Sequence, residues 1–190
     1  PLAALASIAA LARLLPERDP HPSLYEVTIF VLSFLDDATV WPALVVRWEL
    51  ALLGELGFGL DLATCAATGS QEDLIYVSPK SGRAVSAGAG EPYKDRLLTL
   101  PRFLTDGGRS GYVSQAELLA GLSLTQHFIE SRVLAPREEA LPAPRARLAE
   151  LLALERHTST GTLDDHEFTE LNALERREAA AAIGTHATAA

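Results

Sequence analysis

The 190-residue sequence contains no methionine, a single cysteine and few aromatic residues, which make up 6% of the chain. One cysteine excludes an internal disulfide framework and is typical of a reducing compartment, so we expect a cytoplasmic protein. No apolar run approaches the roughly 20 residues that a membrane span requires. Because methionine is absent even at position 1, we expect that a segment upstream of Pro1 is missing.

Positive charge is also scarce. Lysine and arginine number 16 against 25 acidic residues, which gives a net charge of −9. This balance argues against nucleic-acid binding through bulk charge, because phosphates attract basic surfaces. The charge is uneven, however, since the stretch from Lys80 to Arg109 holds six basic residues and three acidic ones. The distribution permits a local basic patch.

Motifs for catalysis are few. The lone Cys65 has no histidine near it in the sequence, and such a cysteine is more often a small buried apolar residue than a nucleophile. The glycine-rich stretch DGGRSG (106–111) lacks the lysine and hydroxyl that end a phosphate-binding loop. His166 and Glu167 lack the second histidine of a zinc-protease helix. We therefore predict no enzymatic activity and no catalytic residues; a Cys65-dependent hydrolase or transferase is the enzyme alternative.

Apolar side chains recur at three- and four-residue steps along most of the chain, which predicts a mainly α protein. A capping box at Ser114 and Glu117 marks one helix start. The stretches LIYVS and RAVS, joined by PKSG, predict a β-hairpin over 74–86. Helices are expected over residues 2–15, 23–34, 42–56, 93–103, 114–134 and 145–156, with one more acidic helix over 163–182. The β-branched residues of 23–34 leave a strand as the alternative there.

These elements predict a helical bundle with a small inserted β-hairpin. We expect the first part of the bundle over 1–59 and the hairpin insertion over 60–92. The second part of the bundle should follow over 93–156. An acidic tail, partly helical or disordered, is expected over 157–190.

The insertion has the outline of a zinc knuckle that has lost its ligands. Zinc in a structural site takes four close nitrogen or sulfur donors, arranged as two pairs with short spacing. The corresponding positions here are Cys65 and Thr68 before the hairpin and Ser86 and Ala89 after it. Only one of the four is a thiolate donor. The sequence therefore predicts a degenerate, zinc-ribbon-like subdomain without metal, and no cofactor.

The run RWELALLGELGFGLDLATCAATG, followed by DLIYVSPKSGRAVS, resembles the RecO family of DNA repair and recombination mediators. More narrowly, it is similar to the branch of that family whose zinc site has been lost. The resemblance covers roughly residues 1–150, and the tail from about Glu155 matches nothing in the family. The residues that carry it are Arg47, Trp48, Glu49, Leu56, Gly57, Phe58, Gly59 and Cys65.

The resemblance implies a protein that works without catalysis. Members of the family begin with an oligonucleotide-binding barrel, which this chain lacks. They bind single- and double-stranded DNA, anneal strands, join RecR and contact the acidic C-terminal tail of single-stranded DNA-binding protein, so that RecA can load. The alternative function is a helical protein–protein adaptor with no nucleic-acid role.

Two groups of residues are candidates for these contacts. An acidic peptide that ends in a free carboxylate needs an apolar pocket edged by a guanidinium, and Arg47 and Trp48 supply both chemical types. The alternative is that Trp48 lies in the core and Arg47 covers its solvent edge. For DNA, the candidate phosphate contacts are basic residues of the insertion and of two later segments, with solvated surface charge as the alternative. These candidates are Lys80, Arg83, Lys94, Arg96, Arg102, Arg145 and Arg147.

Overall fold

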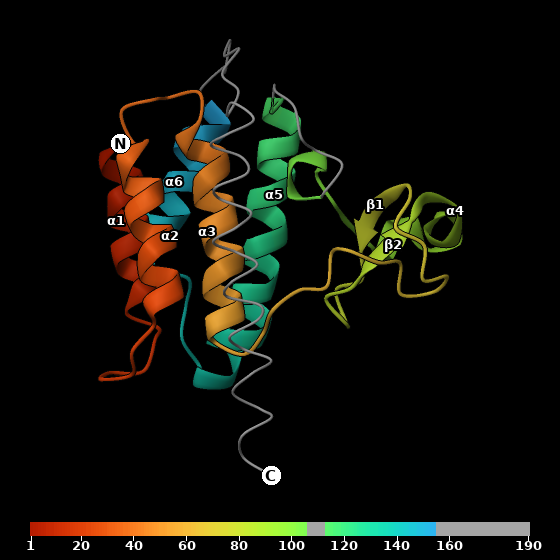
Figure 1. Cartoon of the computed structure of the whole chain (residues 1–190), viewed down its shortest axis with the longest axis horizontal. Helices are drawn as coiled ribbons and strands as arrows, with labels where there is room; N and C mark the ends of the chain where they lie inside the picture. The colour runs from red at the N-terminus through yellow and green to blue at the C-terminus, as the bar shows by residue number, and fades with distance from the viewer. Residues whose placement is uncertain (106–112, 155–190) are drawn as a thin grey trace.

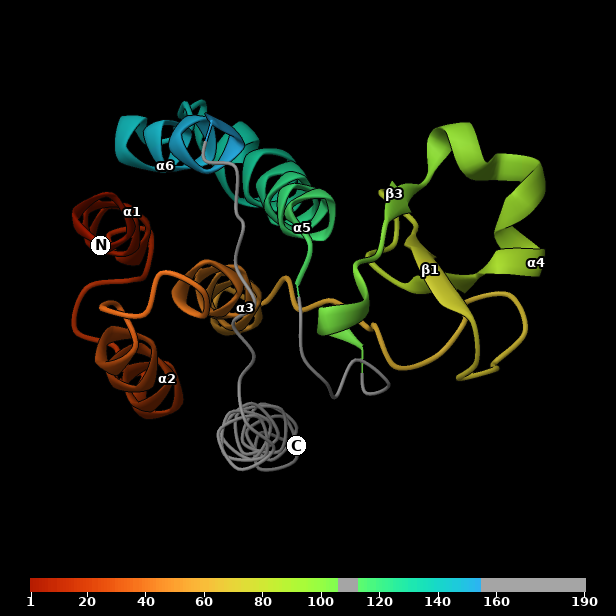
Figure 2. The same ribbon diagram turned by 90° about the horizontal axis from the view of Figure 1, so that it is seen from above.

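The computed structural model describes residues 1–105 and 113–154. Within these ranges the chain forms a bundle of long helices with a small lobe at one side (Figures 1 and 2). Mainly helical structure with a small β element confirms the predicted fold class. The bundle helices are α1 (Leu2–Ala12), α2 (Pro22–Ser33), α3 (Trp41–Glu55), α5 (Gln115–Phe128) and α6 (Ala143–Leu154).

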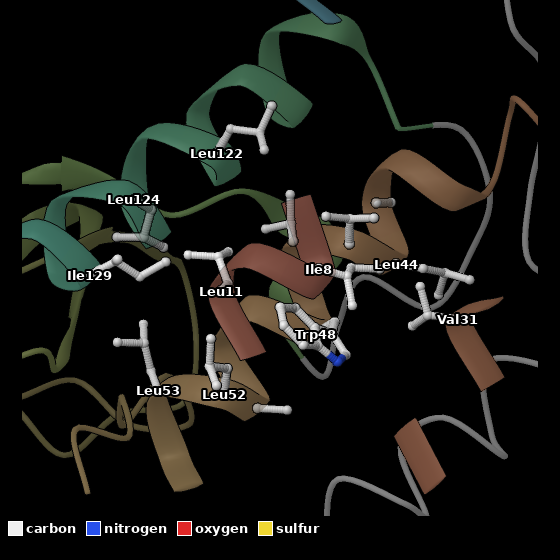
Figure 3. Packing of buried hydrophobic residues seen from close by; sticks show 14 of the residues in the cluster. Ile8, Leu11, Val31, Leu44, Trp48, Leu52, Leu53, Leu122, Leu124 and Ile129 are labelled. Carbon is white, nitrogen blue, oxygen red and sulfur yellow. The ribbon is translucent and has the colours of Figure 1, made fainter. Parts of the chain in front are cut away.

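Helix α3 is the centre of the bundle. Nine consecutive residues, Trp41 to Glu49, are buried, so every face of this helix is covered. Helices α2 and α5 pack against it on different sides, and α1 packs against both α3 and α6 (Figure 2). Apolar side chains of these helices converge around Trp48 and Leu52 (Figure 3). An element covered all round tolerates an almost uninterrupted apolar sequence, which is why α3 has no polar face.

The predicted helix boundaries in the bundle follow local signals. Proline stands in the first turn of both α2 and α3, where its missing N–H costs nothing. The capping box at the start of α5 is confirmed: the Glu117 amide donates to Ser114 Oγ (3.2 Å), and the Ser114 amide donates to the Glu117 carboxylate (3.2 Å). Beyond α5 the chain widens into a π-helix, η3 (Ile129–Leu134), and then tightens into the 3₁₀ turn η4 (Ala135–Arg137).

The lobe, defined here as residues 60–105, contains a three-stranded antiparallel sheet of order β2–β1–β3. The expected hairpin is present, with β1 paired to β2. Around the sheet lie one short helix and two 3₁₀ turns. The elements are β1 (Leu74–Val77), β2 (Ala84–Ser86), α4 (Ala87–Gly90), η1 (Glu91–Arg96), β3 (Leu98–Thr99) and η2 (Arg102–Leu104).

The helix predicted over 93–103 is wrong. In its place stand η1, β3 and η2, because residues 98 and 99 pair with β1 across the sheet. Pro101 adds a local reason, since the residue before a proline is biased towards extended backbone. The insertion thus contributes a strand beyond residue 92, where we placed its end.

Three predicted features lie outside the described residues: the loop over 106–111, the helix over 163–182 and the tail over 157–190. In the described ranges, no helix has both the length and the apolar character needed to cross a lipid bilayer.

Candidate functional site

The chain around Cys65 forms a tight turn that backbone hydrogen bonds close. The Cys65 amide donates to the Ser70 carbonyl (2.7 Å), and the Gly69 amide donates back to the Cys65 carbonyl (2.9 Å). Gly69 adopts φ +73°, a left-handed conformation that glycine takes without strain. The Ala66 amide reaches the carbonyl of Ala84 in β2 (2.8 Å), so the turn is tied to the hairpin.

Three of the four predicted knuckle positions meet at the Cys65 sulfur. The Ser86 amide donates to Sγ (3.3 Å), and the Ser86 hydroxyl lies 3.4 Å from it. The Thr68 hydroxyl lies near enough to lower the pKa of the thiol. Hydrogen bonds from hydroxyl and amide groups thus hold the arrangement that a metal ion would hold in a complete knuckle.

The donor set of the knuckle does not fit zinc. It offers one thiol and two hydroxyls, whereas structural zinc takes four thiolate or imidazole ligands. Among residues 1–105 and 113–154, no three His, Cys, Asp or Glu side chains come together as a group that would hold a metal ion. The knuckle's hydrogen bonds therefore give it a structural role in closing the lobe.

The same hydrogen bonds set the acidity of the thiol. Burial raises the pKa of Cys65, but donors from Ser86, Thr68 and the Ala67 backbone outweigh this effect and lower the pKa to about 6. The side chain is nevertheless only 1% exposed. An anionic sulfur that solvent cannot reach makes a poor nucleophile, because reactivity needs access as well as ionisation.

We predict that Ser86→Ala raises the pKa of Cys65 above about 6, because the Ser86 hydroxyl makes the largest lowering contribution. Cys65 is the only cysteine in the chain, so ultraviolet thiolate absorbance followed against pH measures this residue alone. Ser70→Ala is the matched control, since that hydroxyl accepts from the Glu72 amide instead. An unchanged titration midpoint in Ser86→Ala would contradict the assignment.

A stability measurement tests independently whether folding lowers the pKa of Cys65. A folded-state pKa below the unfolded value of about 8.5 means that the thiolate stabilises the fold above that pH. This contribution is lost as the pH falls through about 6. The difference in unfolding free energy between the wild type and Cys65→Ala should therefore shrink on acidification over that window.

Contacts between the hairpin turn and the end of α5 fix the lobe against the bundle. Gly82 has φ +71°, and a Cβ there would lie 2.8 Å from a Leu60 methyl and 3.7 Å from the Phe128 ring. The Arg132 guanidinium donates to the main-chain carbonyl of Lys80 and lies 5.9 Å from the centre of the Phe128 ring. We did not single out Arg132 from the sequence, and no local signal distinguishes it from other surface arginines.

The structure exposes the five predicted DNA-binding cations of the lobe and Arg147 of α6. Three of these six are neutralised by neighbours: Arg83 pairs with Asp61 (3.1 Å), Lys94 with Glu91 (2.8 Å) and Arg147 with Glu150 (3.1 Å). No ion pair to another described residue is found for Lys80, Arg96 or Arg102. Those three side chains are the strongest candidates for phosphate contacts.

The expected DNA contact of Arg145 is corrected. Its side chain is 0% exposed and extends from α6 to partners on α3 and α5. Nε donates to Glu49 Oε1 (2.5 Å) and Nη2 donates to Glu49 Oε2 (3.1 Å), a two-pronged ion pair. Nη2 also donates to the Leu122 carbonyl (2.9 Å). The charge of Arg145 is therefore neutralised inside the bundle, where no phosphate reaches it.

The two residues predicted to bind a partner peptide lie in the buried run of α3. Trp48 is 1% exposed, and its indole N–H donates to Thr28 Oγ1 of α2 (2.8 Å). A peptide has no surface of Trp48 to contact in this conformation, so the ring acts as core. Arg47 is 7% exposed and offers only an edge of its side chain.

A groove of about 430 Å³ runs between α5, α6 and β3. Among the described residues that line it, the titratable side chains are His127 and Glu130, and none is a lysine or an arginine. A receptor for an acidic tail needs a cation at its edge, so this groove does not match the peptide site expected from the sequence. The groove is lined by Leu98, Leu119, Leu122, Ser123, Gln126, His127, Glu130, Ala149 and Ala153.

Comparison with known proteins agrees with the architecture. The family model described as "Recombination protein O C terminal" matches residues 2–140. A "DNA repair protein RecO" of Methylorubrum extorquens is 53% identical over 151 residues, which cover 77% of this chain and 61% of that protein. The protein of the same name from Beijerinckia indica is 57% identical over 144 residues, which cover 75% of this chain and 58% of that protein.

A third relative, a "DNA repair protein RecO" of Rhodopseudomonas palustris, is 54% identical over 141 residues, or 73% of this chain and 56% of that protein. No solved structure matches the chain. The chain spans about three fifths of the length of the curated relatives that it matches. With more than half of its residues matched by the family model, the chain belongs to the RecO family of DNA repair proteins.

Proposed function

We propose that this chain serves in recombinational DNA repair as a mediator that binds DNA and partner proteins and catalyses no reaction. The observation that carries the proposal is its membership of the RecO family, which rests on a match over residues 2–140. The lack of catalytic motifs in the sequence supports a role through binding. In this proposal the partners are RecR and the acidic C-terminal tail of single-stranded DNA-binding protein, and the outcome is loading of recombinase on single strands.

The lobe is the part of the chain best suited to DNA. Residues 60–105 hold five basic and five acidic residues, so the lobe is neutral in a chain whose net charge is −9. The Asp61–Arg83 and Glu91–Lys94 ion pairs remove two charges of each sign. Lys80, Arg96 and Arg102 remain as exposed cations, beside the exposed acids Glu72, Asp73 and Asp95. In this proposal the three cations neutralise phosphates without reading sequence.

The partner tail is assigned to the side of the bundle where α3 shows the edge of Arg47. A guanidinium pairs with a carboxylate through two parallel hydrogen bonds, which suits a peptide that ends in a free carboxylate. In this proposal Arg47 makes the contact, and Trp48, which is 1% exposed, belongs to the core of the same helix. RecR is proposed as a partner on the ground of the family, and no surface is assigned to it.

A DNA titration tests the proposed function. We expect the 190-residue chain to raise the fluorescence anisotropy of a labelled single strand, with an affinity that falls as salt rises. In Lys80→Gln/Arg102→Gln, the slope of log K against log salt should become less negative by about 1.4, because each phosphate contact to a single strand contributes about −0.7 to it. Glutamine removes the charge and keeps most of the side-chain length.

The control variant is Arg13→Gln/Arg18→Gln, which removes two exposed cations from the end of α1 and the loop that follows. It should leave the salt slope unchanged. An equal loss in both variants would show that DNA contact is not confined to the lobe. If the folded wild-type chain binds no DNA at all, the helical adaptor without a nucleic-acid role becomes the better account.

A further inference from the structure

The 3₁₀ turn η1 (Glu91–Arg96) sorts its six side chains into three rows. With three residues per turn, side chains at positions i and i+3 lie directly above one another. The Glu91–Lys94 ion pair (2.8 Å) shows this spacing directly, because its partners are three residues apart. The two partners neutralise each other, so this row carries no net charge.

The second row holds Pro92 and the exposed Asp95, and the third row pairs an aromatic ring with a cation. Tyr93 and Arg96 are three residues apart, so they share one side of η1. Tyr93 is 60% exposed and Arg96 is also exposed. Neither side chain makes a hydrogen bond or ion pair to another described residue, and the Tyr93 ring stacks on no other described ring. A tyrosine held in water without a partner presents a flat apolar surface to whatever binds there.

The turn is held firmly at both ends. Gly90, just before η1, lies against the Tyr76 ring of β1, and a Cβ at Gly90 would come within 2.4 Å of that ring and 3.1 Å of a Leu97 methyl. After the turn, Leu97 leads directly into β3, which pairs with β1. Figure 2 shows the segment between α4 and β3 at the outer edge of the lobe, away from the bundle. Tyr93 is thus presented on an anchored and accessible element.

We propose that the Tyr93–Arg96 row of η1 is a contact for unpaired bases, in which the tyrosine ring stacks on a base and Arg96 meets a neighbouring phosphate. This inference rests on the proposed function and adds to it a preference for single strands. Stacking on an aromatic ring works for any base, because every base has a flat π face, and combining it with nearby cations is how proteins bind single strands without sequence preference. A paired base is stacked on its own neighbours and leaves Tyr93 nothing to cover.

The test compares three labelled ligands of equal phosphate number: a deoxythymidine single strand, a strand with abasic sites along its length, and a duplex. The protein is the 190-residue chain, as wild type, Tyr93→Leu and Tyr93→Phe. We expect Tyr93→Leu to weaken binding of the thymidine strand by about five- to hundredfold. Binding of the abasic strand and of the duplex should change less than twofold. Tyr93→Phe keeps the ring and should bind as the wild type does.

Each other result of this test overturns the stacking contact, the proposed DNA binding, or both. Equal affinities of wild type and Tyr93→Leu for the thymidine strand, with both proteins folded, overturn the stacking contact and leave the proposed DNA binding intact. That result would favour a protein partner at this tyrosine. Uniform weakening on all three ligands also overturns the inference, because it would show a contact that does not depend on bases. If the folded wild type binds none of the ligands, the inference and the proposed DNA binding both fall.

Discussion

Replacing Arg145 with methionine is expected to lower the free energy of unfolding by about 3–5 kcal/mol, the cost of breaking a buried ion pair by removing one partner. The substitution leaves the Glu49 carboxylate at 0% exposure with one remaining side-chain donor among the described residues, the Thr125 hydroxyl (2.5 Å). A small domain has only about 5–15 kcal/mol of stability in total, so the change takes a large share of it. Urea unfolding followed by circular dichroism measures the loss.

Arg147→Met is the matched control for Arg145→Met. It makes the same chemical change two residues further along α6, where the side chain is 60% exposed and pairs with Glu150. An exposed pair of this kind contributes about 0–1 kcal/mol, so the control should unfold almost as the wild type does. If the two substitutions cost the same, the buried assignment of Arg145 is wrong.

A double variant keeps the prediction testable if Arg145→Met fails to fold. Glu49→Leu/Arg145→Met removes both charges and fills the space with apolar groups, which is often neutral or stabilising relative to the ion pair. Thr125 Oγ1 keeps the carbonyls of Gly121 and Leu122 as partners (3.2 Å each). We expect the double variant to be more stable than Arg145→Met alone, the non-additive result that coupled residues give. Additive losses would contradict the coupling.

Replacing Trp48 with alanine is expected to cost about 3–5 kcal/mol, as large-to-small changes in a core do. The indole is 1% exposed and lies among apolar side chains of neighbouring helices (Figure 3). Its loss also breaks a hydrogen-bond chain in which Trp48 donates to Thr28 (2.8 Å) and Thr28 donates to the Leu24 carbonyl (2.6 Å). Urea unfolding again provides the measurement. A loss below about 1 kcal/mol would mean that the ring is not part of the core.

A substitution of the neighbouring Arg47 distinguishes a role in peptide binding from the structural role of Trp48. With a labelled acidic peptide that ends in a phenylalanine carboxylate, Arg47→Ala should weaken binding by about ten- to hundredfold, the range expected for a lost charge-assisted hydrogen bond. Trp48→Phe keeps an aromatic core residue and should leave the peptide affinity of the folded protein unchanged. A stronger effect from Trp48→Phe than from Arg47→Ala would show that the peptide reaches the indole after all.

Much of the bundle could be read from local signals. These signals are the capping box at Ser114, the prolines that open α2 and α3, and the apolar run of α3. Each acts within a few residues, so each can be recognised in the sequence. The motif from Arg47 to Cys65 identified the family for the same reason, because its residues are close together in sequence. Where the decisive contact was distant, the prediction failed, as for residues 98 and 99, which pair with β1 more than twenty positions away.

The knuckle lies between these cases. Sequence spacing marked Cys65, Thr68 and Ser86 as related positions, and the structure brings all three to one sulfur. The spacing contained no information on the hydrogen bonds that replace the missing ligands. Those hydrogen bonds form because the fold brings the amide and hydroxyl of Ser86, in β2, next to the Cys65 sulfur. They lower the pKa of the thiol to about 6, a value that composition alone does not suggest.

By itself, the sequence determined the helical class, the family and the presence of a hairpin without metal ligands, because these follow from periodicity, short motifs and residue chemistry. The tertiary structure alone decided which charges are available for binding. Arg145 and Arg147 are two positions apart and identical in chemistry, yet one faces Glu49, 96 residues away, and the other faces water. Residues two apart on a helix do not share a face. Which face is buried is settled by the neighbouring helices, and local sequence does not specify them.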